Sequence, residues 1–288
     1  MLNTLKSYSP IFLIGLTSVV MSGCSEDKTS SSENVSLSAM SASLHVTSAD
    51  GSTATVEARL KDEDRDNVLI LNNGDRFYAA VDQDIFAFQS NGNLFSNIND
   101  FSQTTKVLKA RTDTPSSGDL LIELASFGLI DADDRASPNG WYGNTFDDID
   151  ENSEFTISFV RKNNDNAPYS RIQLPQSFTI DAPTADDSLS RANDDIHVVW
   201  SPAEENAQVA LKVLINCLDD SSEWETTPDE NNGQFTVSAG TLDTSLAGEC
   251  TTTIRVQQSR LGILDSAFGH GGRIFGHQTR SITFQSTE

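Results

Sequence analysis

Apolar and polar residues alternate with a period of two over most of this chain, the pattern of β-strands with one buried face. Clear runs in the first half lie at 35–39, 40–46, 54–60, 68–71, 77–81, 155–159 and 172–180. Asn72-Asn73-Gly74-Asp75 lies between two of these runs and predicts a tight hairpin turn. No segment of helical length shows a convincing period of about 3.6, so the pattern predicts an all-β protein.

A second series of alternating runs follows a polar, strand-poor stretch at 181–195. It lies at 196–200, 209–217, 235–237, 250–256 and 282–284. Weaker strands are expected at 85–89, 105–110 and 120–124. Many short strands separated by Gly, Asn, Asp and Ser turns are typical of antiparallel sandwiches. We therefore predict two antiparallel, Ig-like β-sandwich domains, 35–183 and 184–288.

The first 23 residues have the layout of a secretory signal. Lys6 supplies a positive charge, an apolar core runs over 11–21, and Ser22 and Gly23 are small residues at a cleavage point. This core is shorter than the about 20 residues that a transmembrane helix needs. We expect 1–23 to be removed, and the Ser-rich stretch within 24–34 to form a flexible tether.

Met21-Ser22-Gly23-Cys24 resembles the lipobox of bacterial lipoproteins. The resemblance implies that Cys24 becomes the first mature residue and carries acyl chains such as palmitate, which would hold the protein to a membrane. In enteric bacteria an Asp after the lipidated cysteine marks retention in the inner membrane. Ser25 stands there instead, so the resemblance favours the outer membrane.

The strand pattern around Trp200, Cys217 and Cys250 resembles immunoglobulin and fibronectin type III sandwiches, although the Trp precedes both cysteines instead of lying between them. With the lipobox, the tether and the strand-rich segments 155–183 and 196–200, the whole arrangement resembles Gram-negative lipoproteins of unknown function that carry Ig-like β-domains. That resemblance implies a protein of the cell envelope and diagnoses no activity.

Acidic residues outnumber basic residues by 42 to 19, which gives a formal net charge of −23. Phosphate backbones repel a chain of this charge, so the composition argues against nucleic-acid binding. The plain interpretation is a soluble, self-repelling surface, and specific cation binding is the alternative.

Two cysteines remain beyond Cys24. Cys217 ends one apolar strand face and Cys250 begins another, so both thiols should point into the same core. An even pair in an exported chain predicts a disulfide between them, and free buried thiols are the alternative. The chain has no Cys-x-x-Cys or mixed Cys/His spacing of the kind that binds zinc.

The segment 62–67 places Asp62, Asp64 and Asp66 at alternate positions of an expected loop. Converging carboxylates are the ligands that Ca²⁺ prefers. Counted as an EF-hand loop, the segment has Asn67 where Gly is required and Asn73 where Glu is required. A looser calcium site is therefore one interpretation, and a solvated acidic turn is the favoured one.

Two further segments suggest ligand binding. Trp141 and Tyr142 lie between glycines, where exposed rings could stack on a sugar or contact a partner; the favoured alternative is that they cover a sheet. The segment 269–273, followed by His277 and Arg280, gathers positive charge near glycines and could bind an anion. A glycine-rich hairpin before the last strand is the favoured interpretation there.

The chain contains no recognisable catalytic motif, and His45 and His197 lie inside strand patterns, as structural or surface residues do. We therefore expect a non-enzymatic, membrane-anchored module that binds an envelope protein or a glycan, or supports assembly. Two alternatives stay open. One is a hydrolase of polysaccharide or peptide that uses paired carboxylates. The other is an adhesion module stabilised by calcium.

Overall fold

The computed structural model describes residues 28–71, 75–81, 105–110, 140–150, 152–162, 164–218 and 220–288. Within these ranges the chain forms strands β1 to β18 and two single-turn 3-10 helices, Ser32–Asn34 and Leu37–Ala39. The predicted all-β fold class is confirmed. The expected signal 1–23, Cys24, the hairpin turn 72–74 and the strands at 85–89 and 120–124 lie outside the described residues.

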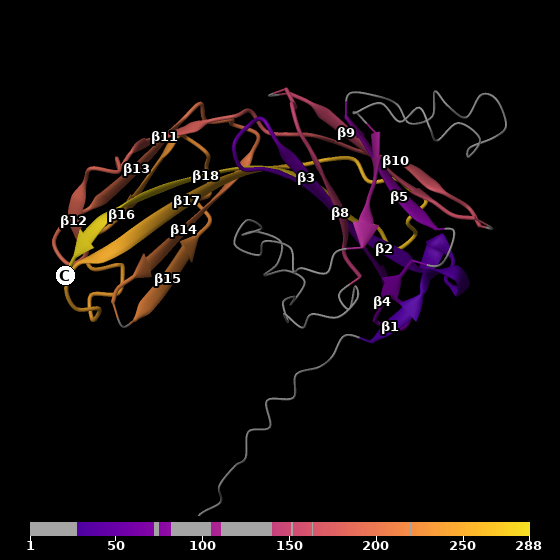
Figure 1. Cartoon of the computed structure of the whole chain (residues 1–288), viewed down its shortest axis with the longest axis horizontal. Coiled ribbons are helices and arrows are strands. Elements are labelled where there is room, and N and C mark those ends of the chain that lie inside the picture. The colour runs from indigo at the N-terminus through magenta and orange to yellow at the C-terminus, as the bar shows by residue number, and fades with distance from the viewer. Residues whose placement is uncertain are drawn as a thin grey trace, which may run out of the picture.

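One long sheet runs through the whole molecule (Figure 1). Its main path, in spatial order, is β1 (Thr29–Ser31), β4 (Asn67–Ile70), β3 (Ala54–Asp62), β2 (Met40–Ser48), β18 (Gly272–Thr287), β17 (Cys250–Leu261), β14 (Gln208–Asn216) and β15 (Ser221–Thr226). The side branches are β8 (Tyr142–Phe146) on β3, β7 (Lys109–Ala110) on β8, and β12 (Ser188–Ser190) on β18.

Two smaller sheets each cover one half of the long sheet, so that each half is a β-sandwich. The first consists of β10 (Ala167–Gln173), β9 (Glu154–Val160), β5 (Arg76–Val81) and β6 (Thr105–Val107). The second consists of β11 (Thr179–Ala182), β13 (Ile196–Ser201) and β16 (Gln234–Val237). The strand expected at 105–110 is present as β6 and β7.

Each sandwich encloses its own apolar core. In the first core, alternate residues of β2 and β3 meet aromatic residues of the covering sheet, and the rings of Phe77 and Phe159 lie 4.9 Å apart. In the second core, Trp200 from the covering sheet is fully buried against residues of β14, β17 and β18. The period-two pattern of the sequence therefore marks the strand faces that these cores bury.

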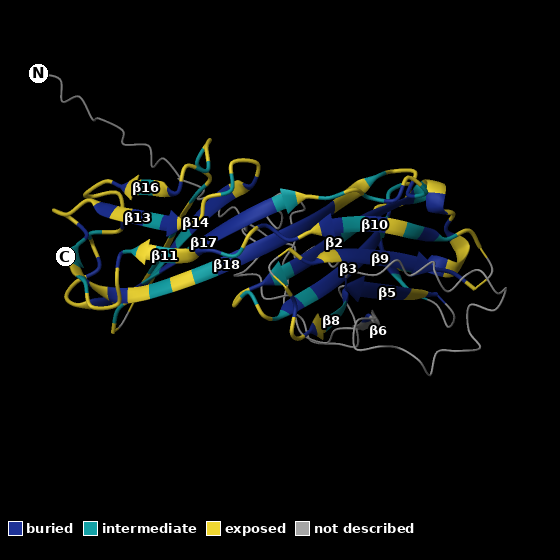
Figure 2. Cartoon of the chain, turned by 90° about the horizontal axis from the view of Figure 1, so that it is seen from above, coloured by how far each residue is buried: buried dark blue, intermediate teal, exposed yellow. Residues whose placement is uncertain are grey.

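The antiparallel pair β17–β18, here called the ribbon, belongs to both sandwiches. Its register continues without a break from Cys250 opposite Ser286 to Leu261 opposite Phe275. The middle of the ribbon is buried where it passes from one half to the other (Figure 2). The start of β18 also pairs in parallel with β2. The sheet thus crosses the expected boundary between 183 and 184, and the division into two domains stays a prediction.

Polar side chains fasten the link between the halves, residues 174–178, to the ribbon. Gln258 is fully buried, and its carboxamide oxygen accepts a hydrogen bond from the backbone N–H of Glu204 (3.1 Å). The Glu204 carboxylate forms an ion pair with Arg260 and accepts a hydrogen bond from the backbone N–H of Gln176 (2.9 Å). These contacts tie the link to both the ribbon and the second sandwich.

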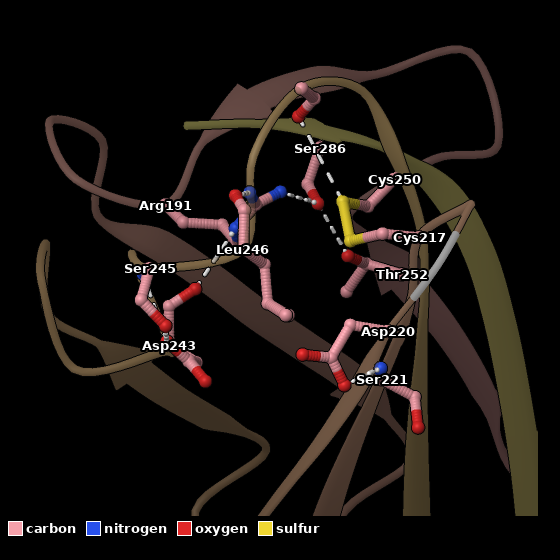
Figure 3. The surroundings of a disulfide bond; sticks show 11 residues. Arg191, Cys217, Asp220, Ser221, Asp243, Ser245, Leu246, Cys250, Thr252 and Ser286 are labelled. Carbon is pink, nitrogen blue, oxygen red and sulfur yellow. Dashed lines mark hydrogen bonds between the residues drawn. A yellow bond between two sulfur atoms is a disulfide. The ribbon is translucent and has the colours of Figure 1, made fainter.

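The predicted disulfide between Cys217 and Cys250 is present and closes 33 residues of chain. It joins the end of β14 to the start of β17, as the strand parity predicts. Closing a loop of this length stabilises the fold by about 3–4 kcal/mol in the chain-entropy model. The guanidinium of Arg191 lies nearby and donates hydrogen bonds to Ser286 Oγ (2.9 Å) and to the carbonyl of Leu246 (Figure 3).

The N-terminal part of the described chain is held to the first sandwich. Residues Thr29–Ser31, expected to belong to a flexible tether, form β1 and pair in parallel with β4, and Ser32–Asn34 form a helical turn. The tether prediction is therefore wrong for 29–34. The composition of this stretch is that of a linker, but backbone pairing with an edge strand requires no apolar side chain.

A buried ion pair fixes this N-terminal stretch. The guanidinium of Arg161 lies 3.5 Å from the carboxylate of Asp75 and donates a hydrogen bond to the carbonyl of Ser32 (2.6 Å). The same carboxylate accepts hydrogen bonds from Ser32 Oγ (2.7 Å) and from the backbone N–H of Lys162 (3.3 Å). Because both charges are buried, each depends on the other for compensation.

We predict that Arg161→Met lowers the free energy of unfolding by about 3–5 kcal/mol, because it leaves the Asp75 carboxylate buried without its counter-charge. Adding Asp75→Asn should recover part of that loss. Urea unfolding of the single and double variants measures both effects. Arg65→Met is the matched control, since Arg65 also faces an aspartate but is mostly exposed, and it should cost less than about 1 kcal/mol. Equal losses from Arg161→Met and Arg65→Met would contradict the prediction.

Candidate functional site

A group of polar side chains, all of them buried except the half-buried Ser43, lies on the face of the long sheet that points away from the first core. Ser43 and His45 of β2, Gln257 and Ser259 of β17, and His277 of β18 form it, and we call these five residues the histidine cluster. In each strand, the residues directly before and after a member of the cluster face the opposite way. The three strands adjoin one another in the sheet, which brings the side chains together.

The two imidazoles are joined edge to edge within a chain of hydrogen bonds. Gln257 Nε2 lies 2.8 Å from His277 Nδ1, and Ser259 Oγ lies 2.8 Å from the same nitrogen. His277 Nε2 lies 3.3 Å from His45 Nδ1, and His45 Nε2 lies 2.9 Å from Ser43 Oγ. An amide nitrogen can only donate, so His277 Nδ1 must accept. The His277 imidazole is then neutral, with its proton on Nε2, the nitrogen that faces His45.

Aromatic and charged side chains surround the cluster. The rings of Phe275 and His277 stack at a centroid distance of 5.7 Å, and His45 lies 5.7 Å from the Trp141 ring. The guanidinium of Arg59 lies over that indole at 5.8 Å. Glu57 stands directly opposite His45 in the pairing of β2 with β3 and is buried as well. The cluster is therefore closely packed as well as hydrogen-bonded.

Burial holds the pKa of His277 well below its ordinary value, and the neighbouring His45 lowers this pKa further. A protonated His277 would present an N–H to the amide donor of Gln257, so the network accommodates only the neutral ring. Ser259 is 1% exposed and His277 is fully buried. A serine nucleophile must reach its substrate, and this one does not reach solvent. The arrangement is that of a structural network that responds to acid.

Sequence reasoning did not find the histidine cluster. His45 was expected to be structural or at the surface, and His277 was grouped with the cationic segment near residues 269–273. The only sequence signal is that His45 occupies a polar position of the run 40–46, and no predicted run includes His277. His45 and His277 lie 232 positions apart, and nothing near either residue in the sequence indicates that their strands are neighbours. The other cations of that segment lie elsewhere: His270 faces Asp64 (3.5 Å), and Arg280 donates to Ser177 Oγ (2.7 Å).

The three aspartates proposed as calcium ligands have separate partners. Asp62 is buried and accepts hydrogen bonds within its own turn, Asp64 faces His270, and Asp66 forms an ion pair with Lys61. Over the described part of the chain, no three His, Cys, Asp or Glu side chains are grouped so as to hold a metal ion. The structure does not bring these carboxylates together, and calcium binding stays a prediction.

Trp141 and Tyr142 are buried, with 4% and 6% of their surfaces exposed. Tyr142 lies against Phe77 in the first core, and its hydroxyl accepts a hydrogen bond from the backbone N–H of Leu71 (2.8 Å). Trp141 lies on the other face, beside His45. Both positions fit the interpretation that the rings cover a sheet. They do not form an exposed platform for a sugar.

An open cleft of about 870 Å³ lies between the loops that precede β14 and follow β15. Its polar lining includes the carboxylates of Glu205, Asp229 and Glu230, all of them exposed. A glycosidase-type general acid needs a carboxyl group in a site that excludes water. The cleft therefore does not favour the hydrolase alternative.

No protein-family model matches the chain, and no curated protein is similar to it. Among solved structures, it is similar to a tetra-tandem repeat in the extending region of a large adhesion protein, with 13% identity and a TM-score of 0.22. The alignment covers 85% of this chain, which spans about half (50%) of the other. Similarity at this level carries no conclusion about function. The described residues also include no helix long and apolar enough to cross a membrane.

We predict that acid destabilises the protein through His277. In the unfolded chain an imidazole gains its proton as the pH falls through about 6.5, whereas the folded chain keeps His277 neutral to a lower pH. The free energy of unfolding should therefore fall below pH 6.5, by at most about 1.4 kcal/mol per pH unit, until the folded pKa is reached.

Urea unfolding at a series of pH values measures this slope. His277→Gln should remove it, and His197→Gln, at an exposed position of β13, is the matched control that should keep it. A His277→Gln variant with the same pH slope as the natural chain would contradict the assignment.

Proposed function

We propose that the protein is a rigid, non-enzymatic module of the cell envelope that is anchored by lipid at Cys24 and presents binding surfaces on an elongated all-β body. The observation that carries this proposal is the ribbon. Because β17 and β18 belong to both sandwiches, the halves share a hydrogen-bonded backbone in addition to the link at 174–178. A body of this kind holds its surfaces at fixed separation and orientation.

The start of β1 limits how far the body could stand from a membrane. The backbone of Lys28 is already held, since its carbonyl accepts a hydrogen bond from the N–H of Val68 (2.8 Å). Only four residue steps separate Lys28 from Cys24, and an extended chain covers at most about 14 Å in that number. An acyl chain on Cys24 would hold the β1–β4 end of the first sandwich close to the bilayer. Ser25 supports the outer membrane as its location.

The proposal that the module is non-enzymatic is supported by side-chain chemistry as well as by the lack of motifs. Of the two Ser–His contacts in the histidine cluster, that of Ser259 with His277 is buried and that of Ser43 with His45 is partly buried, and the acidic cleft is exposed to solvent. Neither arrangement favours a hydrolase, and the separate partners of Asp62, Asp64 and Asp66 do not favour a calcium-dependent adhesion module. The partner we propose is an envelope protein or a glycan. The net charge of −23 argues against nucleic acid.

We predict that the chain produced in a Gram-negative host begins at Cys24 and carries acyl chains. Mass spectrometry of the N-terminal peptide and membrane fractionation measure this directly. Cys24→Ala should leave the signal uncleaved, because lipidation would have no acceptor thiol. Ser25→Asp is the matched control: it should keep the lipid but shift the protein to the inner membrane. An unmodified natural chain that begins at Met1 would contradict lipidation.

We also predict a single, narrow distance distribution between spin labels placed at Asn34 and Ala247, which are exposed positions in opposite halves. Pulsed electron resonance measures the distribution, and bioorthogonal labels leave the disulfide intact. Arg260→Ala removes the ion pair with Glu204 and leaves the ribbon intact, so the distance distribution of this variant should stay narrow. A broad or double distribution in the natural chain would contradict a rigid body.

A further inference from the structure

The ribbon strand β18 has one stretch that pairs with none of the described strands on its outer side. Its residues 272–278 pair with β2, and its residues 285–287 pair with β12, both in parallel and both on that side. Between them, the six residues from 279 to 284 pair with β17 on the inner side, and no described strand pairs with them on the outer side. In Figure 2 this part of β18 forms the rim of the second sandwich. We call it the β18 slot.

The direction of the backbone groups can be read from the bonds at either end. On the outer side, the N–H of Gln285 donates to Asp187 and the carbonyl of Gly271 accepts from Ala42. On the inner side, the carbonyl of Ile274 accepts from Gly262, next to β17. Odd-numbered residues of β18 therefore direct N–H and C=O outward, because backbone groups alternate along a strand. Ser281 and Thr283 present theirs to the slot.

The slot has no proline and no bulge, and its one charged residue, Arg280, is half-buried with its guanidinium donating to Ser177 Oγ and to the carbonyl of Thr279. Proteins block such edges with charges, Pro or bulges that prevent pairing with another chain. The edge strand β15, at the end of the long sheet, carries the exposed carboxylates of Glu223 and Glu225. In the slot, the exposed side chains are the small, neutral Ser281 and Thr283. Exposed charges thus protect the edge at β15, and no exposed charge protects the slot.

We infer that the β18 slot binds an extended segment of another protein by β-strand addition, and that this segment has alternating apolar and polar residues with a basic residue near each end. A gap of six residues is about 20 Å long, which fits one short strand. Because β2 and β12 close it at both ends, the edge of another folded sheet does not fit between them.

Side-chain chemistry supports this occupant. On the core side of the slot, Ile282 and Ile180 are only partly buried against the second core, and apolar side chains of an added strand would cover them. Asp50 follows the end of β2 and Asp187 precedes β12, so each end of the slot has a carboxylate beside it. Basic groups at both ends of the segment would complement these charges. This inference requires neither the lipid anchor nor the rigidity of the body.

Hydrogen exchange of the full chain in mild detergent tests the inference, with acetyl-Lys-Val-Thr-Val-Thr-Val-Lys-amide as the probe. At about 1 mM peptide, the amides of residues 281 and 283 should exchange at least about tenfold more slowly, because a bound strand must detach before they exchange. The control peptide has the same sequence with alternate backbone nitrogens methylated on the pairing edge. It should give no protection.

Two variants at one position separate backbone pairing from side-chain contact. Ser281→Ala keeps the outward N–H and should keep the protection. Ser281→Pro removes that N–H without removing a bond to β17, since this residue directs its backbone outward, and should abolish the protection at 283. Failure of the natural chain to show protection, or protection that survives Ser281→Pro or the methylated peptide, would overturn the inference. So would protection without peptide that grows with protein concentration, which would identify a second copy as the occupant.

Discussion

The hydrogen bonds between β17 and β18 run from one apolar core to the other, alongside the short link at 174–178. Sandwich proteins usually place their sheets within one core, and neighbouring domains meet through side chains. Here a backbone ladder passes from one core to the other, and its register has no bulge at the crossing. Bending the molecule at its middle would therefore break backbone pairs in a buried region, which costs more than separating exposed side chains.

The polar residues near the crossing follow from that constraint. A sheet that is buried at its centre removes water from both faces, so every polar group there needs a partner within the protein. Gln258 finds its partners in the loop at Glu204, and Gln257 finds one in His277. These residues resemble a binding site in composition, yet their donors and acceptors already serve one another. The contacts of Gln258 beside the link and the contacts within the histidine cluster thus both compensate polar groups that the sheet removes from water.

The sequence predicted the parts of the structure that depend on neighbours along the chain. Alternation marked the strands of both halves, and the parity of Cys217 and Cys250 indicated their disulfide. It did not predict features that depend on which distant strands become neighbours. The pairing of β18 with β2 has no local signal, so the meeting of His45 with His277 could not be foreseen. The ordered strand β1 was missed because its stabilisation comes from backbone pairing and from Arg161, far along the chain.

The pairing of β18 with β2 also has a consequence for how the protein reaches its final form. β2 lies near the start of the described chain and β18 near its end, so the ribosome makes β18 after every strand that it contacts. Contacts of such long sequence separation form slowly, because a large loop must close before they contribute. Neither core is complete until β18 is available, since Ile274 belongs to one and Phe284 to the other. A nascent chain would thus leave both cores incomplete until β18 has been synthesised, and an incompletely folded chain is the state that passage through a narrow membrane channel requires.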